Sequence, residues 1–139
     1  MSDSVSTSDW VTDYYADVDA LRLEPFVARH AQDAVVVFGN QPPTVGIAAI
    51  RDAFEGFWAM IGGMRHEVHH RWDENDGRTA ILEVTTHYTT RGGAHVPLPC
   101  VSILDRDDAG KVTSLRIHID LAPLFAAIET ESREAATIS

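Results

Sequence analysis

The chain has little cysteine, few basic residues and no long hydrophobic run. Its 139 residues include one cysteine, Cys100, which excludes an internal disulfide and a cysteine-rich zinc site. No apolar segment approaches the roughly 20 residues that a membrane-spanning helix needs. The polar, acidic start from Met1 to Asp9 does not resemble a signal peptide. We therefore expect a cytoplasmic protein that makes no membrane contact.

The balance of charge excludes a second class of partner. Lys and Arg number 11 against 21 Asp and Glu, for a formal net charge of −10. Nucleic acids are bound by basic surfaces that neutralise phosphates, so we expect no nucleic-acid partner. What the chain does contain is 45% hydrophobic residues and seven histidines. This composition predicts one domain over residues 1–139 with a core of its own, and it offers several acid/base groups.

The spacing of apolar residues predicts an α+β protein. Helical spacing gives way to alternation with a period of two after the third helix. The expected helices are 11–21, 24–30, 46–61 and 121–128, the expected strands are 34–38, 65–73, 78–90, 94–104 and 111–119, and a mobile tail is expected at 129–139. Helices that precede a run of strands predict a curved, mixed, mostly antiparallel sheet wrapped by the N-terminal helices. A sheet wrapped in this way would enclose one pocket for a small ligand.

The last predicted strand carries the first candidate for a catalytic acid or base. Its polar face alternates through Ser114, Arg116, His118 and Asp120. Desolvation at the apolar mouth of a cavity raises the pKa of a carboxylate, which suits a general base. His118 is on the same face and could share the proton. The alternative is that Asp120 caps the following helix while His118 lies on a solvated or dimer face.

A second candidate for proton transfer lies on the strand predicted at 78–90. There His87 follows Ile81, Glu83 and Thr85 along one face. Polar residues in the middle of a sheet either line a wet cavity or face solvent. We assign His87 to the pocket as a proton relay and keep the solvent-exposed position as the alternative.

The segment from His66 to His70 matches the H-E-x-x-H pattern of zinc proteases. That motif needs a helix, whereas this segment alternates with a period of two and therefore predicts a strand. We expect no metal site here. On a regular strand His66 and His70 share a face, and His66 is either a pocket residue or a hydrogen-bonded structural histidine. His69 and His30 are expected at the surface.

Aromatic and polar residues of other elements complete the predicted pocket. Tyr14 and Tyr15 lie on the first helix, and a buried tyrosine hydroxyl needs a partner such as a ligand oxygen. Trp58 lies on the long helix and either packs in the core or forms a pocket wall. Asn40 follows the first strand and either braces its loop or contacts a ligand. Cys100 is expected to be an inert buried thiol.

Several short segments of the chain occur in an order shared with one superfamily. They are Tyr14–Tyr15, AQDAVVVF, VGIAAIRDAF, GMRHEV, RGGAHVPLPCV and DAGKVTSLRIHIDL. Over residues 9–127 this order resembles the SnoaL-like branch of the nuclear transport factor 2-like superfamily, with its ketosteroid isomerase-like cone. The resemblance implies one pocket, a small-molecule ligand and a homodimer formed through the open sheet face. Because one scaffold hosts many reactions, it implies no single activity.

Two subfamilies of this superfamily are poorly matched. Ketosteroid isomerases carry carboxyl groups at positions that fall near Phe38 and Ser102, so the resemblance argues against that activity. Limonene epoxide hydrolases carry an arginine and an aspartate that fall near Glu83 and Thr85. The group that protonates the epoxide oxygen in those enzymes would therefore be missing here. Asn40 could still match their asparagine.

Two other subfamilies match better. SnoaL-type polyketide cyclases use an aspartate on the final strand as acid or base, and Asp120 is similar to it. Scytalone dehydratase has a first-helix tyrosine and two pocket histidines. The nearest positions in this chain are Tyr15, His66 and His95.

The residues and the resemblance together predict a cofactor-independent acid/base enzyme for a small, apolar, oxygenated compound of polyketide, terpenoid or steroid type. It would act by cyclisation, isomerisation, dehydration or hydrolysis, with no metal. The expected catalytic residues are Asp120, His118 and His87, and the expected substrate-binding residues are Tyr14, Tyr15, Asn40, Trp58, His66 and His95. One alternative is a non-catalytic binding or accessory protein with the same pocket. Another is a structural dimer whose cavity is filled by side chains.

Overall fold

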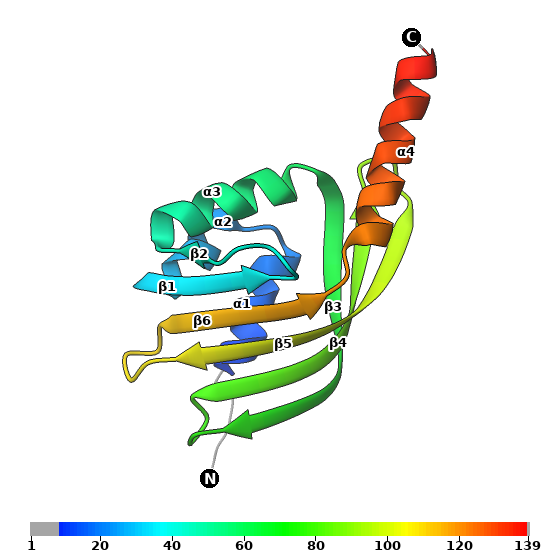
Figure 1. The fold of residues 1–139 in the computed structure, drawn as a ribbon. Helices are drawn as coiled ribbons and strands as arrows, with labels where there is room; N and C mark the ends of the chain where they lie inside the picture. The colour runs from blue at the N-terminus through cyan, green and yellow to red at the C-terminus, as the bar shows by residue number, and fades with distance from the viewer. Residues whose placement is uncertain (1–8, 139) are drawn as a thin grey trace.

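The computed structural model describes residues 9–138, and its elements follow the predicted order (Figure 1). The helices are α1 (Trp10–Asp19), α2 (Leu23–Ala28), α3 (Ile47–Trp58) and α4 (Ala122–Ile138), and the strands are β1 (His30–Phe38), β2 (Thr44–Val45), β3 (Ile61–Glu74), β4 (Thr79–Thr90), β5 (His95–Arg106) and β6 (Val112–Ile119). The two-residue strand β2 adds to the predicted set. No helix within the described range is long and apolar enough to cross a membrane.

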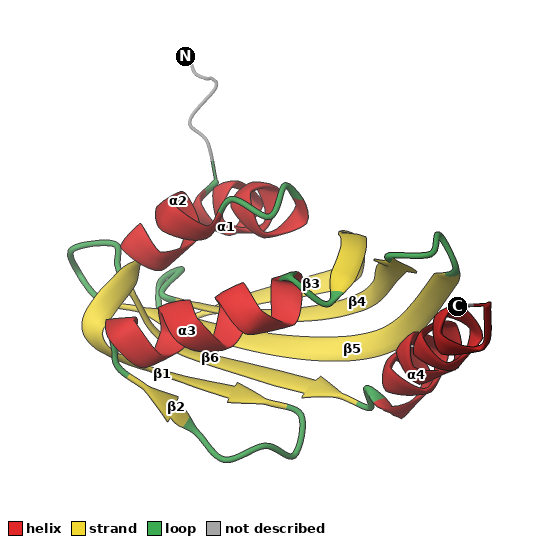
Figure 2. Cartoon of the chain, turned by 90° about the horizontal axis from the view of Figure 1, so that it is seen from above, coloured by secondary structure: helices red, strands yellow, loops and turns green. Residues whose placement is uncertain are grey.

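The strands form one curved sheet in the order β2-β1-β6-β5-β4-β3. β1 runs parallel to β6, and the other neighbouring strands are antiparallel. Helices α1, α2 and α3 cover one face of the sheet, while α4 extends from one end of it (Figure 2). The predicted α+β cone with a mixed, mostly antiparallel sheet is therefore confirmed.

The core lies between the helices and the face of the sheet that they cover. The Asp9 carboxylate accepts a hydrogen bond from the backbone N–H of Val11 at 3.1 Å and so caps the start of α1. Ile50, Phe54 and Trp58 recur every four residues along α3 and are buried. Alternate residues of β4 are buried beneath them, so helices and sheet share one apolar interior.

A β-bulge in β3 divides its histidines between the two faces of the sheet. The pairing with β4 shifts register between Val68 and His70, and an extra residue turns the following side chains to the other face. His66 therefore faces the helices, whereas His70 binds Glu83 on the outer face. The prediction that His66 and His70 share a face is wrong for this reason. His69 is exposed, as predicted.

His30 was expected at the surface, but it is only 3% exposed. Its Nδ1–H donates to the Phe26 carbonyl at 2.9 Å, so its Nε2 accepts from the Tyr14 hydroxyl, also at 2.9 Å. Burial lowers the pKa of His30 below 6.5 and raises the pKa of Tyr14 well above 10.0. Both side chains are therefore neutral, and they join α1, α2 and the start of β1.

A mobile tail was expected at 129–139, but helix α4 continues as far as Ile138, and Ser139 lies outside the described residues. Glu131 accepts hydrogen bonds from the hydroxyl of Thr90 and from the backbone N–H of Gly92, the second at 3.1 Å. A Cβ atom at Gly92 would lie 2.7 Å from this carboxylate, so a larger residue there would make the Glu131 side chain shift. The helix is thus tied to the hairpin between β4 and β5.

Burial of His30 predicts that the fold loses stability as the pH falls through 6.5 towards the lower pKa of the folded protein. The unfolded chain takes up a proton near the ordinary pKa of 6.5, whereas the folded protein does so at a lower pH. The free energy of unfolding should therefore decrease as the pH is lowered. This one group contributes at most about 1.4 kcal/mol per pH unit. Urea unfolding at several pH values should show a flatter dependence in His30→Gln. The exposed-site control His69→Gln should keep the wild-type slope, and equal slopes in both variants would contradict the prediction.

Candidate active site

An aromatic cavity lies between the helices and the sheet. Its wall is made of Tyr14, Tyr15, Val18, Phe26, Phe38, Phe54, Phe57, Trp58, Met64, His66, Thr86, Tyr88, Cys100, Ser102, Leu115 and Ile117. Half of these sixteen residues are aromatic, and none is lysine or arginine. The cavity volume is about 30 Å³, which is room for about two water molecules.

The titratable group of this wall that is best oriented for proton transfer is His66. Asp19, at the end of α1, holds it by hydrogen bonds. The Nδ1–H of His66 donates to Asp19 Oδ1 at 2.6 Å, and the backbone N–H of the same residue donates to Asp19 Oδ2 at 3.1 Å. The carboxylate therefore fixes both the orientation and the tautomer of the ring. In the neutral ring Nε2 is left as a proton acceptor.

Polar side chains continue from His66 across the sheet. Thr86 lies directly opposite His66 in the β3–β4 pairing, so both side chains project from the same face. On β5 the Cys100 sulfur lies 3.6 Å from the Ser102 hydroxyl. Burial raises the pKa of the Cys100 thiol, which keeps it protonated. The inert thiol expected from the sequence is thus a polar, neutral part of the wall.

The tyrosines of the cavity remain hydroxyl donors. Burial raises the pKa of Tyr15 and of Tyr88 above the ordinary value of 10.0, and a hydrogen bond with Ser102 opposes part of the rise at Tyr15. The Tyr15 ring also packs on the His66 ring, with centroids 4.6 Å apart. The cavity wall therefore holds neutral O–H groups together with the imidazole of His66.

Four predicted site residues contribute to the cavity wall: Tyr14, Tyr15, Trp58 and His66. Of these, Tyr14 has its hydroxyl bound to His30, which suits it to a structural role. Tyr15, Trp58 and His66 have the positions from which a ligand could be contacted.

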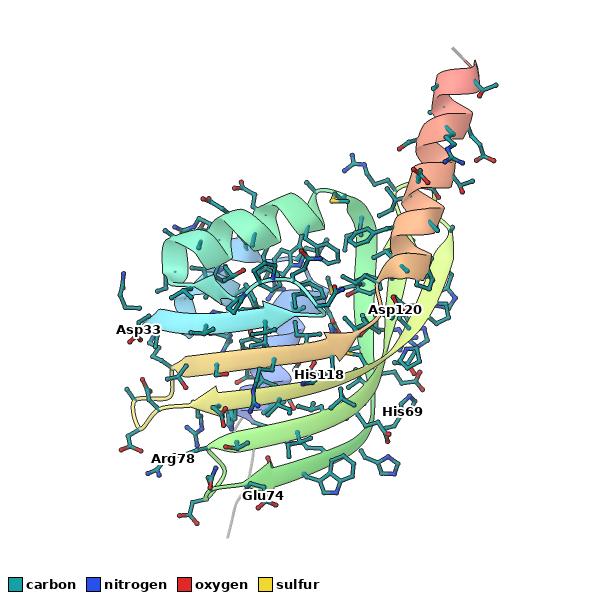
Figure 3. All side chains as sticks on the ribbon, viewed as in Figure 1. Asp33, His69, Glu74, Arg78, His118 and Asp120 are labelled. Atoms are coloured by element: carbon teal, nitrogen blue, oxygen red, sulfur yellow. The ribbon has the colours of Figure 1, made fainter. Side chains whose placement is uncertain are left out.

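Three predicted histidines lie on the other face of the sheet. The cavity is lined by the residues that alternate with them, so His87, His95 and His118 point away from it. His87 Nε2–H donates to Glu67 at 2.8 Å, and His87 Nδ1 lies 2.8 Å from His95 Nε2. The hydrogen bond from His87 lowers the pKa of the Glu67 carboxyl. His118 is exposed on the same outer face, as is His69 (Figure 3).

Asp120 and Asn40 come together, but in a different place. Both line an open groove of about 450 Å³ beside the start of α4. Asp120 is exposed there, and its carboxylate accepts the backbone N–H of Ala122 at 2.9 Å (Figure 3). This is the helix cap kept above as the alternative. The groove shares Phe38 with the cavity wall, so it lies against the cavity without containing His66.

Asp19, Thr86 and Ser102 belong to the site but were not predicted from the sequence. Asp19 had no signal, because its partner is 47 positions away in the chain. Thr86 and Ser102 alternate with apolar neighbours on the buried faces of β4 and β5. The sequence feature that could have identified them is a single hydroxyl residue on the otherwise apolar face of a strand.

The part of the chain that the structure describes contains no cluster of three or more His, Cys, Asp or Glu side chains arranged to hold a metal ion. The zinc-protease pattern at His66 to His70 lies on a strand, where the bulge separates its outer histidines. Helical i, i+4 ligation is therefore impossible in this segment.

The model of the SnoaL-like domain matches residues 11–115, which is most of the chain. The chain belongs to the SnoaL-like family. No curated protein matches this SnoaL-like chain in sequence.

Solved structures share the fold of this SnoaL-like protein at low identity. The epoxide hydrolase/cyclase-like enzyme SalBIII, studied in pyran ring formation in salinomycin, has a TM-score of 0.70 and 18% identity over 81% of this chain and 88% of its own. A protein with a ketosteroid isomerase-like fold from Catenulispora acidiphila, in complex with trimethylamine, has a TM-score of 0.72 and 17% identity over 84% and 89%. TerC, co-crystallised with polyporic acid, has a TM-score of 0.71 and 20% identity over 86% and 95%. At these identities the likeness shows the fold.

The Asp19–His66 contact predicts a tautomer that can be measured. Wild-type His66 should carry its proton on Nδ1 at neutral pH. In Asp19→Asn the amide oxygen can still accept the backbone N–H, but the amide NH2 must then face Nδ1, which moves the ring proton to Nε2. Long-range ¹H–¹⁵N spectra distinguish the two forms. Asp13→Asn on the same helix should leave the wild-type tautomer, and an Nδ1–H form in both variants would refute the assignment.

Proposed function

We propose that this SnoaL-like protein is a cofactor-independent acid/base enzyme for small, apolar, oxygenated compounds, with His66 as the base. The observation that carries the proposal is the Asp19–His66 pair, because His66 also belongs to the aromatic cavity wall. The substrate classes are those expected from the sequence: polyketide, terpenoid or steroid-like molecules. Family membership supports cyclisation or isomerisation as the reaction type.

In the proposed mechanism, neutral His66 takes a proton from an acidic C–H or O–H group of the substrate through Nε2. Asp19 then stabilises the imidazolium that forms, because it already accepts the hydrogen bond from Nδ1. Tyr15 supplies an O–H donor beside the ring for the negative charge that develops on a substrate oxygen. His66 returns the proton at another atom of the substrate, which completes an isomerisation or a ring closure.

This proposal transfers the role of base from Asp120 to His66. Asp120, His118 and His87 are not part of the cavity wall, and Asp120 is engaged as a helix cap. The Asp120 carboxylate is exposed, so it lacks the desolvation that favoured it as a general base. Asn40 and Asp120 can contact parts of a substrate that extend into the outer groove.

The alternative function is a non-catalytic small-molecule-binding protein. It is favoured by the small volume of the cavity, about 30 Å³, which Phe38 and Phe57 help to close with ring centroids 5.2 Å apart. A ligand larger than two waters needs these rings to move. Such a cavity could bind a compound without converting it.

Exchange of substrate protons with solvent tests the acid/base proposal without knowledge of the product. Acetophenone and α-tetralone in D2O should lose their α-proton NMR signals faster with the wild-type protein than in buffer. His66→Gln should reduce the rate to the buffer background, because the base is removed. Asp19→Asn should reduce it by about a hundredfold, because the ring takes the wrong tautomer.

The control for this experiment is His69→Gln, which removes an exposed histidine of the same strand and should leave the exchange rate unchanged. If the ketones bind and the wild-type protein exchanges no protons, the acid/base proposal fails and the binding protein is favoured. If His66→Gln exchanges protons at the wild-type rate, His66 is not the base.

We also propose that the protein is a cytoplasmic homodimer formed through the outer face of the sheet. Trp72, Ile81 and Ile103 lie opposite one another on β3, β4 and β5 and form an apolar row there. Trp72 is 49% exposed, and a second copy would remove it from water. A cytoplasmic location is supported by the single, unpaired and buried Cys100.

Light scattering tests the dimer. The wild-type protein should have twice the mass of the chain, and Trp72→Glu should convert most of it to monomer, because a charge is placed in the buried row. Val45→Glu is the matched control, since Val45 is a 60% exposed apolar residue on the edge strand β2. A wild-type monomer, or a Trp72→Glu dimer of unchanged stability, would reject this interface.

A further inference from the structure

Two buried side-chain polar atoms in the described part of the chain have no hydrogen-bond partner, and both belong to the wall of the same cavity. They are Trp58 Nε1 and Thr86 Oγ1. Trp58 is 7% exposed and Thr86 is 1% exposed, so solvent at the protein surface does not satisfy them. Buried polar groups are nearly always paired in native proteins, and an unpaired one is destabilising. The coincidence of both in one cavity calls for a ligand.

Three other polar groups of the wall have partners within the protein. The Tyr14 hydroxyl donates to His30, the His66 ring donates to Asp19, and the Cys100 thiol lies beside the Ser102 hydroxyl. The Trp58 N–H has no partner, and the Thr86 hydroxyl lies close enough to the Cys100 thiol to oppose part of the rise in its pKa but makes no hydrogen bond of normal geometry. Both groups can therefore still bind a ligand. An indole N–H can only donate, so the partner of Trp58 must be an acceptor.

The two atoms come from opposite sides of the cavity. Trp58 is the last residue of α3, whereas Thr86 lies in the middle of β4, directly opposite His66. A ligand between helix and sheet can thus be held by an oxygen while another of its atoms lies near His66. Thr86 and His66 are neighbours on one face, so the oxygen and the proton to be transferred would be close in the same molecule.

The charge of the wall decides what kind of oxygen it accepts. No lysine or arginine lines the cavity, and the aromatic side chains give a low-dielectric surrounding. A carboxylate or phosphate would lose its hydration with no cation to replace it. A neutral carbonyl or ether oxygen loses little on entry and regains its hydrogen bonds from the protein.

We propose that Trp58 and Thr86 are the specificity-determining pair of this cavity and bind the acceptor oxygen of a neutral cyclic or aromatic ligand. Trp58 donates through Nε1–H and Thr86 through its hydroxyl. The inference rests on the proposed function for its small-molecule ligand, but not on the identity of the base. Its test therefore measures binding preference and needs no turnover.

Three probes of similar shape separate the contributions of the acceptor oxygen, the apolar ring and a negative charge. Acetophenone carries the carbonyl oxygen, and α-methylstyrene has CH2 in its place. In benzoate a carboxylate replaces the acetyl group. Titration calorimetry with the full chain should show acetophenone bound about fivefold more tightly than α-methylstyrene. Benzoate should bind more weakly than both. His66→Gln should keep this preference even where it abolishes proton exchange, so failure of the base and failure of the pair give different results.

Variants at the two positions complete the test. Trp58→Phe and Thr86→Val remove the donors with little change of shape, and each should lower the preference for acetophenone to about twofold or less. Thr86→Ser keeps a hydroxyl and should retain the wild-type preference. Comparison of Thr86→Ser with Thr86→Val therefore tests the role of the hydroxyl even if Trp58→Phe does not fold. The control Thr85→Val alters an outer-face threonine of the same strand and should change nothing.

Three outcomes would overturn the proposal. They are equal binding of acetophenone and α-methylstyrene by the wild type, tighter binding of benzoate, and an unchanged preference in Thr86→Val. The first would mean that water satisfies both atoms, and the second would mean that a cation reaches the site. The third would mean that Thr86 does not contact the oxygen.

Discussion

The contact between Asp19 and His66 joins the two layers of the fold and at the same time defines its chemistry. The Asp19 carboxylate accepts hydrogen bonds from both the backbone N–H and the ring N–H of His66, which lies 47 positions further along the chain. The end of α1 is thereby attached to β3 at the point where β3 still faces the helices. Loss of this carboxylate would leave a backbone N–H unpaired and free the imidazole to rotate. Structural support and ring orientation thus have one origin.

Most of the fold could be predicted from the sequence, because hydrophobic spacing reports secondary structure directly. The change from helical to alternating spacing after α3 predicted the α+β order, and Trp58 and Tyr15 were placed in the cavity wall. The choice of strand face was less successful. On β4 we assigned His87 to the cavity because it is polar, whereas the buried face that carries Thr86 lines it.

The errors have physical causes that alternation alone does not reveal. An apolar pocket is an extension of the core, so its wall lies on the apolar face of each strand, and a histidine on the polar face marks the outside. The bulge in β3 adds a change of face that has no clear sequence signature. The role of Asp19 and the burial of His30 depend on contacts between distant elements, which no local pattern contains.

The rings of Phe38 and Phe57 have a kinetic meaning as well as a geometric one. They belong both to the wall of the inner cavity and to an outer groove of about 470 Å³. A molecule that passes between the two has to wait for aromatic side chains to rotate. Along this route the rate of capture would depend on how often the rings open, and escape would be slowed in the same way. A modest equilibrium affinity can therefore coexist with a long residence time, which gives a slow proton transfer time to occur before the ligand leaves.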